Sequence, residues 1–214
     1  MVSYIKSYRT FLCETLVKLL LYLVGPLITL FWSALIGFIS NKYGIIAQGA
    51  AINLIVLYEL LLDTFVYGGI LSKDTNKLEY LRTSPKGLEI LRKSLVTDKL
   101  RRFLMTAVLL SLIYGISNGN LSLFQFVSIL FAAVTAMELG LLICRRVTVI
   151  TLAMLIALLT NLLVTGLVIP IMYLPGGFVV LYAGLLAAVE IFSNRHIMKK
   201  AKKGYYDEQL EKMF

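Results

Sequence analysis

Long apolar runs constrain this 214-residue chain more than any other feature of its sequence. Six runs made mostly of Leu, Ile, Val, Phe and Ala follow one another, separated by shorter polar segments. A membrane-spanning helix needs about 20 predominantly apolar residues to cross roughly 30 Å of hydrocarbon. The runs leave little chain for a soluble domain. We therefore expect an all-α, polytopic membrane protein with six transmembrane helices.

Composition supports the same class. The chain is 59% apolar and 15% charged, and its mean hydropathy is +0.84. Soluble domains are typically about 45–50% apolar and about 25% charged. A net charge of +9 would suggest nucleic-acid binding in a soluble protein, but in a membrane protein it first has to be tested against topology.

The sequence divides into spans, connections and two polar ends. The N-terminal residues 1–18 repeat apolar side chains at three- and four-residue spacing, which predicts a helix lying in the membrane interface. A charged segment, 72–103, joins the second and third spans, and residues 195–214 form a polar tail. The expected spans are about Leu19–Ser40, Ile45–Leu71, Leu104–Ser117, Leu123–Cys144, Val147–Tyr173 and Phe178–Asn194.

The distribution of basic residues predicts which side each connection faces. With the N-terminus inside, the inner segments hold 20 of the 21 Lys and Arg residues, and the outer turns hold only Lys42. Cytoplasmic connections carry such an excess of basic residues. Both termini are therefore expected in the cytoplasm, and the basic balance reflects topology rather than nucleic-acid binding.

Several enzyme classes lack their required residues. His196 is the only histidine and lies in the basic tail, outside the expected spans, so the sequence matches neither a paired-histidine metalloprotease nor a rhomboid-like Ser–His protease. No G-x-x-x-x-G-K-[ST] phosphate loop occurs either, since Gly68-Gly69 and Gly176-Gly177 precede neither Lys-Ser nor Lys-Thr. We expect no cofactor or metal on this chain and no catalytic residue.

Carboxylates inside the expected spans are the candidate pathway residues. A charge at mid-bilayer costs on the order of 3 kcal/mol or more, so such groups usually face protein or water. They could form a proton or cation relay or line a substrate path, or they could pair with basic residues of the charged segment or tail. The neutral polar residues in the spans could also line a pathway, or they could serve helix packing. The candidate pathway residues are Gln48, Asn53, Glu59, Asp63, Glu138, Asn161 and Thr165. Glu190 is a further carboxylate within an expected span.

The charged segment holds nine Lys and Arg residues interleaved with four acids. Its Ser84-Pro85 break predicts a short helix before the break and an amphipathic helix from about Lys86 leading into the third span. Anionic lipid headgroups could hold such a segment, but the helix–turn–helix pattern and the interleaved acids favour docking into a partner protein.

These features resemble the membrane permease subunit of type-2 ATP-binding cassette exporters. The resemblance covers the interfacial helix, six spans, and one long cytoplasmic connection whose pattern, E-x-L-x-x-L-x-x-(S/L)-P, is similar to Leu78-Glu79-Tyr80-Leu81-Arg82-Thr83-Ser84-Pro85. It implies a coupling helix at about Lys73–Arg82 that inserts into a separate ATPase subunit. The residues so implicated are Lys73, Lys77, Glu79, Tyr80, Arg82, Ser84 and Pro85, with Arg145 and Arg146 at a second, shorter contact.

The resemblance also implies partners and location. ATP and Mg would bind the separate ATPase, and two permease copies would form one pathway in a bacterial plasma membrane. An amphipathic or hydrophobic cargo such as a peptide, antibiotic or lipid-like molecule is expected, because the outer turns are short. The alternatives are an ion- or proton-coupled transporter or channel using Glu59, Asp63 and Glu138, and an accessory protein that anchors a partner.

Overall fold

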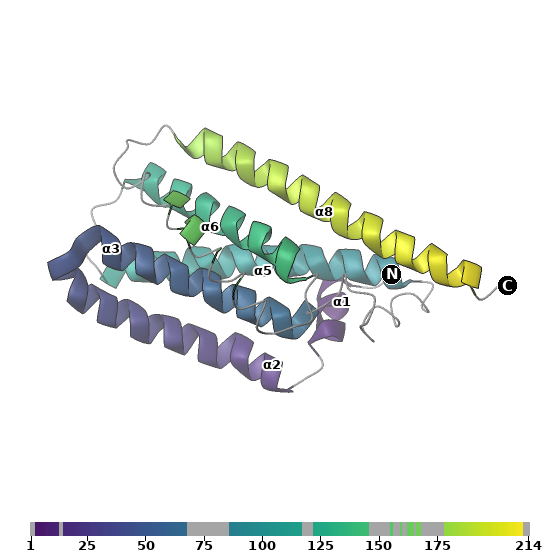
Figure 1. The fold of residues 1–214 in the computed structure, drawn as a ribbon. Helices are drawn as coiled ribbons and strands as arrows, with labels where there is room; N and C mark the ends of the chain where they lie inside the picture. The colour runs from purple at the N-terminus through teal and green to yellow at the C-terminus, as the bar shows by residue number, and fades with distance from the viewer. Residues whose placement is uncertain are drawn as a thin grey trace.

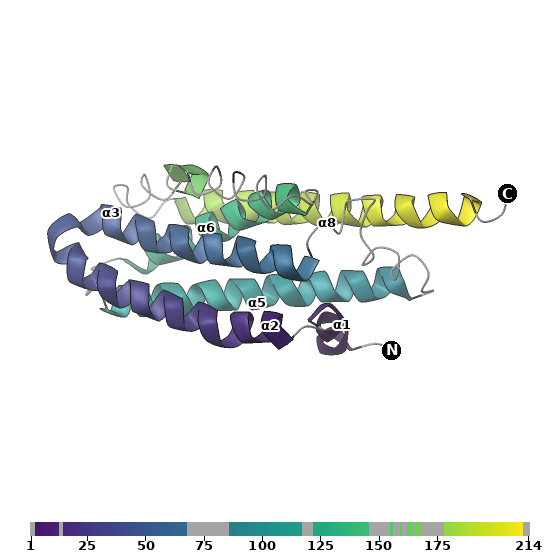
Figure 2. The ribbon, with the colours of Figure 1, turned by 60° about the horizontal axis from the view of Figure 1, so that its bottom comes forward.

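The computed structural model describes residues 3–12, 15–67, 86–116, 122–145, 155, 159, 162–164, 166–167 and 178–211. All the elements bounded within this part of the chain are helices, as expected. They are α1 (Tyr4–Phe11), α2 (Thr15–Leu19), the π-helical η1 (Leu20–Val24), α3 (Gly25–Tyr67), α5 (Gly87–Ile116), α6 (Leu123–Cys144) and α8 (Phe178–Glu211). The long helices form an elongated bundle, with α1 lying across one end beside α5 (Figures 1 and 2).

The 43-residue helix α3 reverses its direction and forms two limbs (Figure 1). A Cβ atom added at Gly25 would lie 1.9 Å from Cζ of Tyr58, whereas two residues so far apart on one straight helix would be about 50 Å apart at 1.5 Å per residue. If both limbs rise equally, the reversal lies about midway, near residues 41–42. The short turn expected between the first two spans, residues 41–44, lies within helix α3.

Helices α5 and α6 follow from local sequence signals. α5 joins the charged residues after Pro85 to the third apolar run in one continuous helix, which confirms the prediction of a helix leading from about Lys86 into that run. α6 has the bounds expected for the fourth run. It begins with a capping box, in which the Ser122 hydroxyl accepts a hydrogen bond from the Gln125 amide and the Gln125 side chain accepts one from the Ser122 amide.

Helix α8 is longer than the sixth span predicted from the sequence. It continues from Phe178 through the predicted boundary at Asn194 to Glu211. Ser193, Ile197 and Ala201 are buried at four-residue intervals, so one face of this extension packs against the bundle. The segment predicted as a polar tail thus continues α8, and a buried stripe holds its first two turns in the fold.

Two apolar clusters fill the bundle interior, and polar residues lie between them. The larger cluster gathers residues such as Ile55, Leu110, Met137 and Tyr182 from α3, α5, α6 and α8. The smaller cluster lies near α1. Its buried members are Tyr8, Leu12, Leu62, Val66, Tyr67, Leu91, Leu95, Leu142, Ile197 and Ala201. Along α5 the buried charged residues Asp98 and Arg102 lie between the members of the two clusters, and along α3 Glu59 and Asp63 lie where the two clusters meet.

Among the described residues, α6 is the one helix long and apolar enough to cross a membrane. Most of it is buried, as a core helix of a soluble protein would also be. The outer surface carries large apolar side chains as well: Tyr22 is 65% exposed, Phe31 66% and Val180 81%. The six-span arrangement therefore stays a prediction.

The close approach of Gly25 to Tyr58 gives a test of the α3 reversal. Gly25→Ala should lower the thermal unfolding temperature in detergent, because the added methyl group must displace the Tyr58 ring. Gly184→Ala is the control: nothing lies within 4 Å of its Cβ position, and Ala favours a helix by up to about 1 kcal/mol over Gly. Equal stabilisation by both substitutions would contradict the close approach.

Candidate functional site

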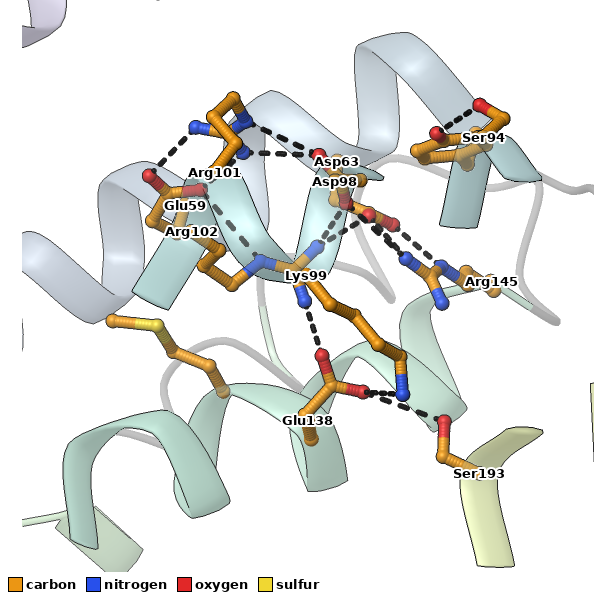
Figure 3. A network of polar contacts seen from close by, with 12 residues as sticks. Glu59, Asp63, Ser94, Asp98, Lys99, Arg101, Arg102, Glu138, Arg145 and Ser193 are labelled. Atoms are coloured by element: carbon orange, nitrogen blue, oxygen red, sulfur yellow. Dashed lines mark hydrogen bonds and ion pairs between the residues drawn. The ribbon is translucent and has the colours of Figure 1, made fainter. Parts of the chain in front are cut away.

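The candidate site is a network of buried and partly buried polar side chains, most of them charged (Figure 3). It joins four helices: α3, α5, α6 and α8. Its members are Glu59 and Asp63 on α3, Asp98, Lys99, Arg101 and Arg102 on α5, Glu138 on α6 with Arg145 at its C-cap, and Glu190 and Ser193 on α8. Helical spacing brings the α5 members together, because Asp98 is three and four residues before Arg101 and Arg102.

Arg102 lies at the centre and is only 1% exposed. Its Nη1 donates to Oε1 of Glu138, and its Nη2 donates to Oδ2 of Asp98 and, at 3.2 Å, to Oδ1 of Asp63. Its Nε lies 3.7 Å from Oε2 of Glu59. A single guanidinium therefore binds carboxylates from α3, α5 and α6, which its planar array of five N–H donors allows.

Arg145 closes the network where α6 ends. Its Nε and Nη2 donate to the two carboxylate oxygens of Asp63 at 3.0 and 2.6 Å. Its guanidinium carbon lies 5.2 Å from the centroid of the Tyr67 ring, a cation–π distance. Tyr67 in turn shares a 2.6 Å hydrogen bond with Ser94 of α5. The end of α6 is thus fixed to both α3 and α5.

Arg101 and Lys99 extend the network to its two sides. Arg101 binds both oxygens of Glu59, at 3.1 and 2.7 Å, and also contacts Asp98 on its own helix. Lys99 lies between two carboxylates, with its Nζ 3.3 Å from Oε2 of Glu138 and hydrogen-bonded to Glu190. Lys99 therefore links α5 to both α6 and α8.

Helix α1 reaches the network through Tyr8. The Tyr8 hydroxyl donates to Oδ1 of Asp98 at 3.3 Å, and the Tyr8 side chain is 5% exposed. Burial and the neighbouring Asp98 carboxylate raise the pKa of Tyr8 above its ordinary value, so the phenol remains a proton donor. The Thr97 hydroxyl also donates to the Tyr4 carbonyl at 3.3 Å, which holds α1 along α5.

This geometry is better suited to fixing helix positions than to acid–base chemistry. Each carboxylate of the network contacts at least one Lys or Arg. Burying a charge is costly unless it is paired and hydrogen-bonded, and breaking a buried pair costs about 3–5 kcal/mol. Sliding α5 by one turn would separate several pairs at once, so the network favours one register of the four helices.

The structure brings three of the predicted pathway residues together. Glu59, Asp63 and Glu138 all belong to the network, paired with basic residues of α5, an arrangement that the sequence left open beside an ion relay. Asn53 is partly buried earlier on α3. The side chain of Gln48 and all of Asn161 and Thr165 lie outside the described part of the chain.

Most of the predicted ATPase-contacting residues also lie outside the described part of the chain. These are Lys73, Lys77, Glu79, Tyr80, Arg82, Ser84, Pro85 and Arg146. Arg145 is described, but its side chain is 1% exposed and bound to Asp63. Its guanidinium is therefore engaged within the bundle, and its contact with a separate subunit stays a prediction.

Four charged members of the network were missed by sequence reasoning, Asp98, Lys99, Arg101 and Arg102, and so was Ser193. The sequence assigned the four charged residues to a cytoplasmic segment whose charges face water or a partner. A signal was available in the apolar residues Val96, Leu100, Leu104 and Val108, which recur every four residues. They are exposed on α5, and the charges between them turn inward.

No group of three or more His, Cys, Asp or Glu side chains that could hold a metal occurs in the described part of the chain. Comparison with known proteins identifies no relative: no protein-family model matches, and neither a curated protein nor a solved structure does. The network itself and its place in the fold are therefore the basis for the functional argument.

The central role of Arg102 can be tested by substitution. Arg102→Met should lower the free energy of unfolding by about 3–5 kcal/mol, since it leaves Asp98 and Glu138 buried with fewer cations. Arg92→Met on the exposed face of the same helix is the matched control and should change little. The measurement is unfolding in mixed detergent micelles.

Arg102→Lys keeps the measurement possible if the methionine variant does not fold. A lysine retains the charge but lacks the planar array that meets carboxylates on three helices, so an intermediate loss is expected. If Arg102→Met and Arg92→Met have equal effects, the network does not stabilise the bundle.

The attachment of α1 gives a separate prediction. Tyr8→Phe removes the hydrogen bond to Asp98 but keeps the buried ring, and it should lower the unfolding free energy by about 1 kcal/mol. Tyr4→Phe is the control, because that side chain is 53% exposed. Hydrogen exchange of the α1 amides should rise in Tyr8→Phe alone, and unchanged exchange would contradict attachment through Asp98.

Proposed function

We propose that this chain is the membrane-spanning permease subunit of an ATP-driven exporter. Its six transmembrane helices cross a bacterial plasma membrane, with both termini on the cytoplasmic side. A separate ATP-binding cassette subunit binds ATP and Mg and hydrolyses the nucleotide. Two permease copies form the pathway.

The observation that carries this proposal is the position of the network on α5. The helix begins five residues after the end of the segment proposed to dock into the ATPase, and its middle turns hold the charges that bind α3, α6 and α8. Movement of α5 is therefore transmitted to the three other helices through paired charges. A transporter driven by a separate subunit needs such a rigid connection between the docking segment and its spans.

In this mechanism the ATPase biases a two-state equilibrium of the bundle. Closure of two ATPase subunits around ATP moves the docking segment Lys73–Arg82, and α5 carries the movement to the other helices. A partner can shift such an equilibrium only by binding one state better than the other. The ion pairs keep α3, α5, α6 and α8 together during the change, so the helices move as a unit.

The proposed cargo is an amphipathic or hydrophobic molecule, such as a peptide, an antibiotic or a lipid-like compound. The short outer connections leave little chain for an external binding domain. The large exposed apolar side chains of α3 and α8 are compatible with a cargo that enters from the bilayer. An ion- or proton-coupled transporter is less well supported, because its carboxylates Glu59, Asp63 and Glu138 are each held by arginine.

Charge reversal in the docking segment tests the proposal. Lys77→Glu, Glu79→Lys and Arg82→Glu together should weaken association with the co-expressed ATPase at least tenfold, because the contact is proposed to use these charges. The matched control reverses the same order of charges at the exposed residues Lys86, Glu89 and Arg92. Association is measured by co-purification and by ATP turnover of the complex.

ATP turnover by the purified chain alone would contradict the proposal, as would equal association of both variants. Uptake driven by a pH gradient in liposomes without ATPase would instead support the ion-coupled alternative.

A further inference from the structure

The exposed face of α8 changes abruptly from apolar to basic. Its first half exposes large apolar side chains, and the last of them are Ile191 at 53% and Phe192 at 61%. Beyond Phe192, the exposed residues as far as residue 202 are all basic: Arg195, Lys199, Lys200 and Lys202. Arg195, Lys199 and Lys202 are spaced by four and three residues and so share one face.

Helix α5 shows the same change in the opposite chain direction. Val96, Leu100, Leu104, Val108 and Leu112 are exposed. On the N-terminal side of Val96, the exposed residues of the helix, Glu89 and Arg92, are charged instead, as is Lys86 just before it.

The two changes lie at the same level of the bundle. Lys99 of α5 contacts Glu190 of α8, and Leu91 and Leu95 share a cluster with Ile197 and Ala201. The two helices are therefore antiparallel. Three residues before Lys99 on α5 is Val96, and three residues after Glu190 on α8 is residue 193, so these two positions lie at the same level. Since both helices rise about 1.5 Å per residue, the apolar faces end within about one turn of each other.

An apolar surface that ends at a common level and continues as cations is complementary to a bilayer with anionic headgroups. Along α8, the acidic residues Asp207, Glu208 and Glu211 follow only after the basic ones, farther from this level. The order along the helix is thus apolar, basic and then acidic, which suits attraction to a negative surface on the inner side.

We propose that the membrane surface meets the bundle between Phe192 and Arg195, and that the face Arg195–Lys199–Lys202 of α8 binds anionic phospholipid headgroups. This inference rests on the membrane-spanning part of the proposed function. The proposed level crosses α5 near Val96, about two helical turns before the span boundary predicted at Leu104. Asp98–Arg102 therefore lie on the hydrocarbon side of the membrane surface, whereas the predicted boundary placed them outside it. The network is then an intramembrane one, shielded from lipid by the four helices.

Lipid preference tests the headgroup site. The full chain in mild detergent is titrated with phosphatidylglycerol or phosphatidylcholine, and bound lipid is counted by native mass spectrometry. Each Lys or Arg near an anionic surface adds about 1 kcal/mol, about fivefold in affinity. The triple variant Arg195→Gln, Lys199→Gln, Lys202→Gln should therefore lose on the order of a hundredfold in its preference for phosphatidylglycerol at low salt.

The control variant changes the same number of charges farther along α8: Asp207→Asn, Glu208→Gln, Glu211→Gln. It should keep the preference, and soluble glycerol phosphate should not displace the lipid. The headgroup site is overturned if the wild-type chain binds both lipids equally or if the basic triple variant keeps its preference. It is also overturned if that variant loses only its association with the ATPase, which would assign the face to a protein.

Depth measurement tests the membrane level separately. In a Trp32→Phe background, which removes the single native tryptophan, Leu100→Trp should be quenched by brominated lipid acyl chains. Arg92→Trp should be quenched by aqueous iodide instead. Aqueous quenching at both positions would place α5 outside the hydrocarbon and would contradict the proposed level. Lipid quenching at residue 100 without a headgroup preference would leave the membrane proposal standing and remove only the headgroup site.

Discussion

The burial of Arg102 among carboxylates from three helices is the interaction on which the bundle depends. A guanidinium at this depth cannot lose its proton, so its charge has to be met by protein groups. Asp98 supplies one on α5 itself, while Asp63 and Glu138 supply the others from α3 and α6. Apolar contacts on either side are non-directional, whereas these pairs depend on both distance and angle. They therefore select the register in which the apolar surfaces also meet.

The same constraint explains why α1 and α8 belong to the fold rather than to loose ends. Tyr8 brings α1 to Asp98, and Lys99 brings α8 to α5 through Glu190. Both contacts lie beside the smaller apolar cluster, where Leu12 and Ile197 are buried. Both α1 and the C-terminal part of α8 are thus held by a few buried side chains, although their composition is polar. A change in the network can therefore reach both segments.

Sequence reasoning predicts helix class and much of the helix order, but it places several inward charges wrongly. The fourth apolar run predicted the bounds of α6, and the Ser84-Pro85 break predicted the start of α5. The network was missed on α5 because charge was taken as a sign of exposure. In a membrane, apolar side chains such as Leu100 can face the lipid, while charged side chains such as Arg102 face the protein interior. Which carboxylate meets Arg102 depends on long-range packing that a single sequence does not display.

The position of the network also limits how the proposed transporter can move. If Asp98–Arg102 lies on the hydrocarbon side of the membrane surface, separating Arg102 from Glu138 would expose charges to lipid, which is costly. Conformational change should therefore occur by rigid movement of α3, α5, α6 and α8 together, with flexibility in the connections or between permease copies. A transporter of this kind would open its pathway where pairing is weak, at the exposed apolar faces, and keep its charged centre closed throughout the cycle.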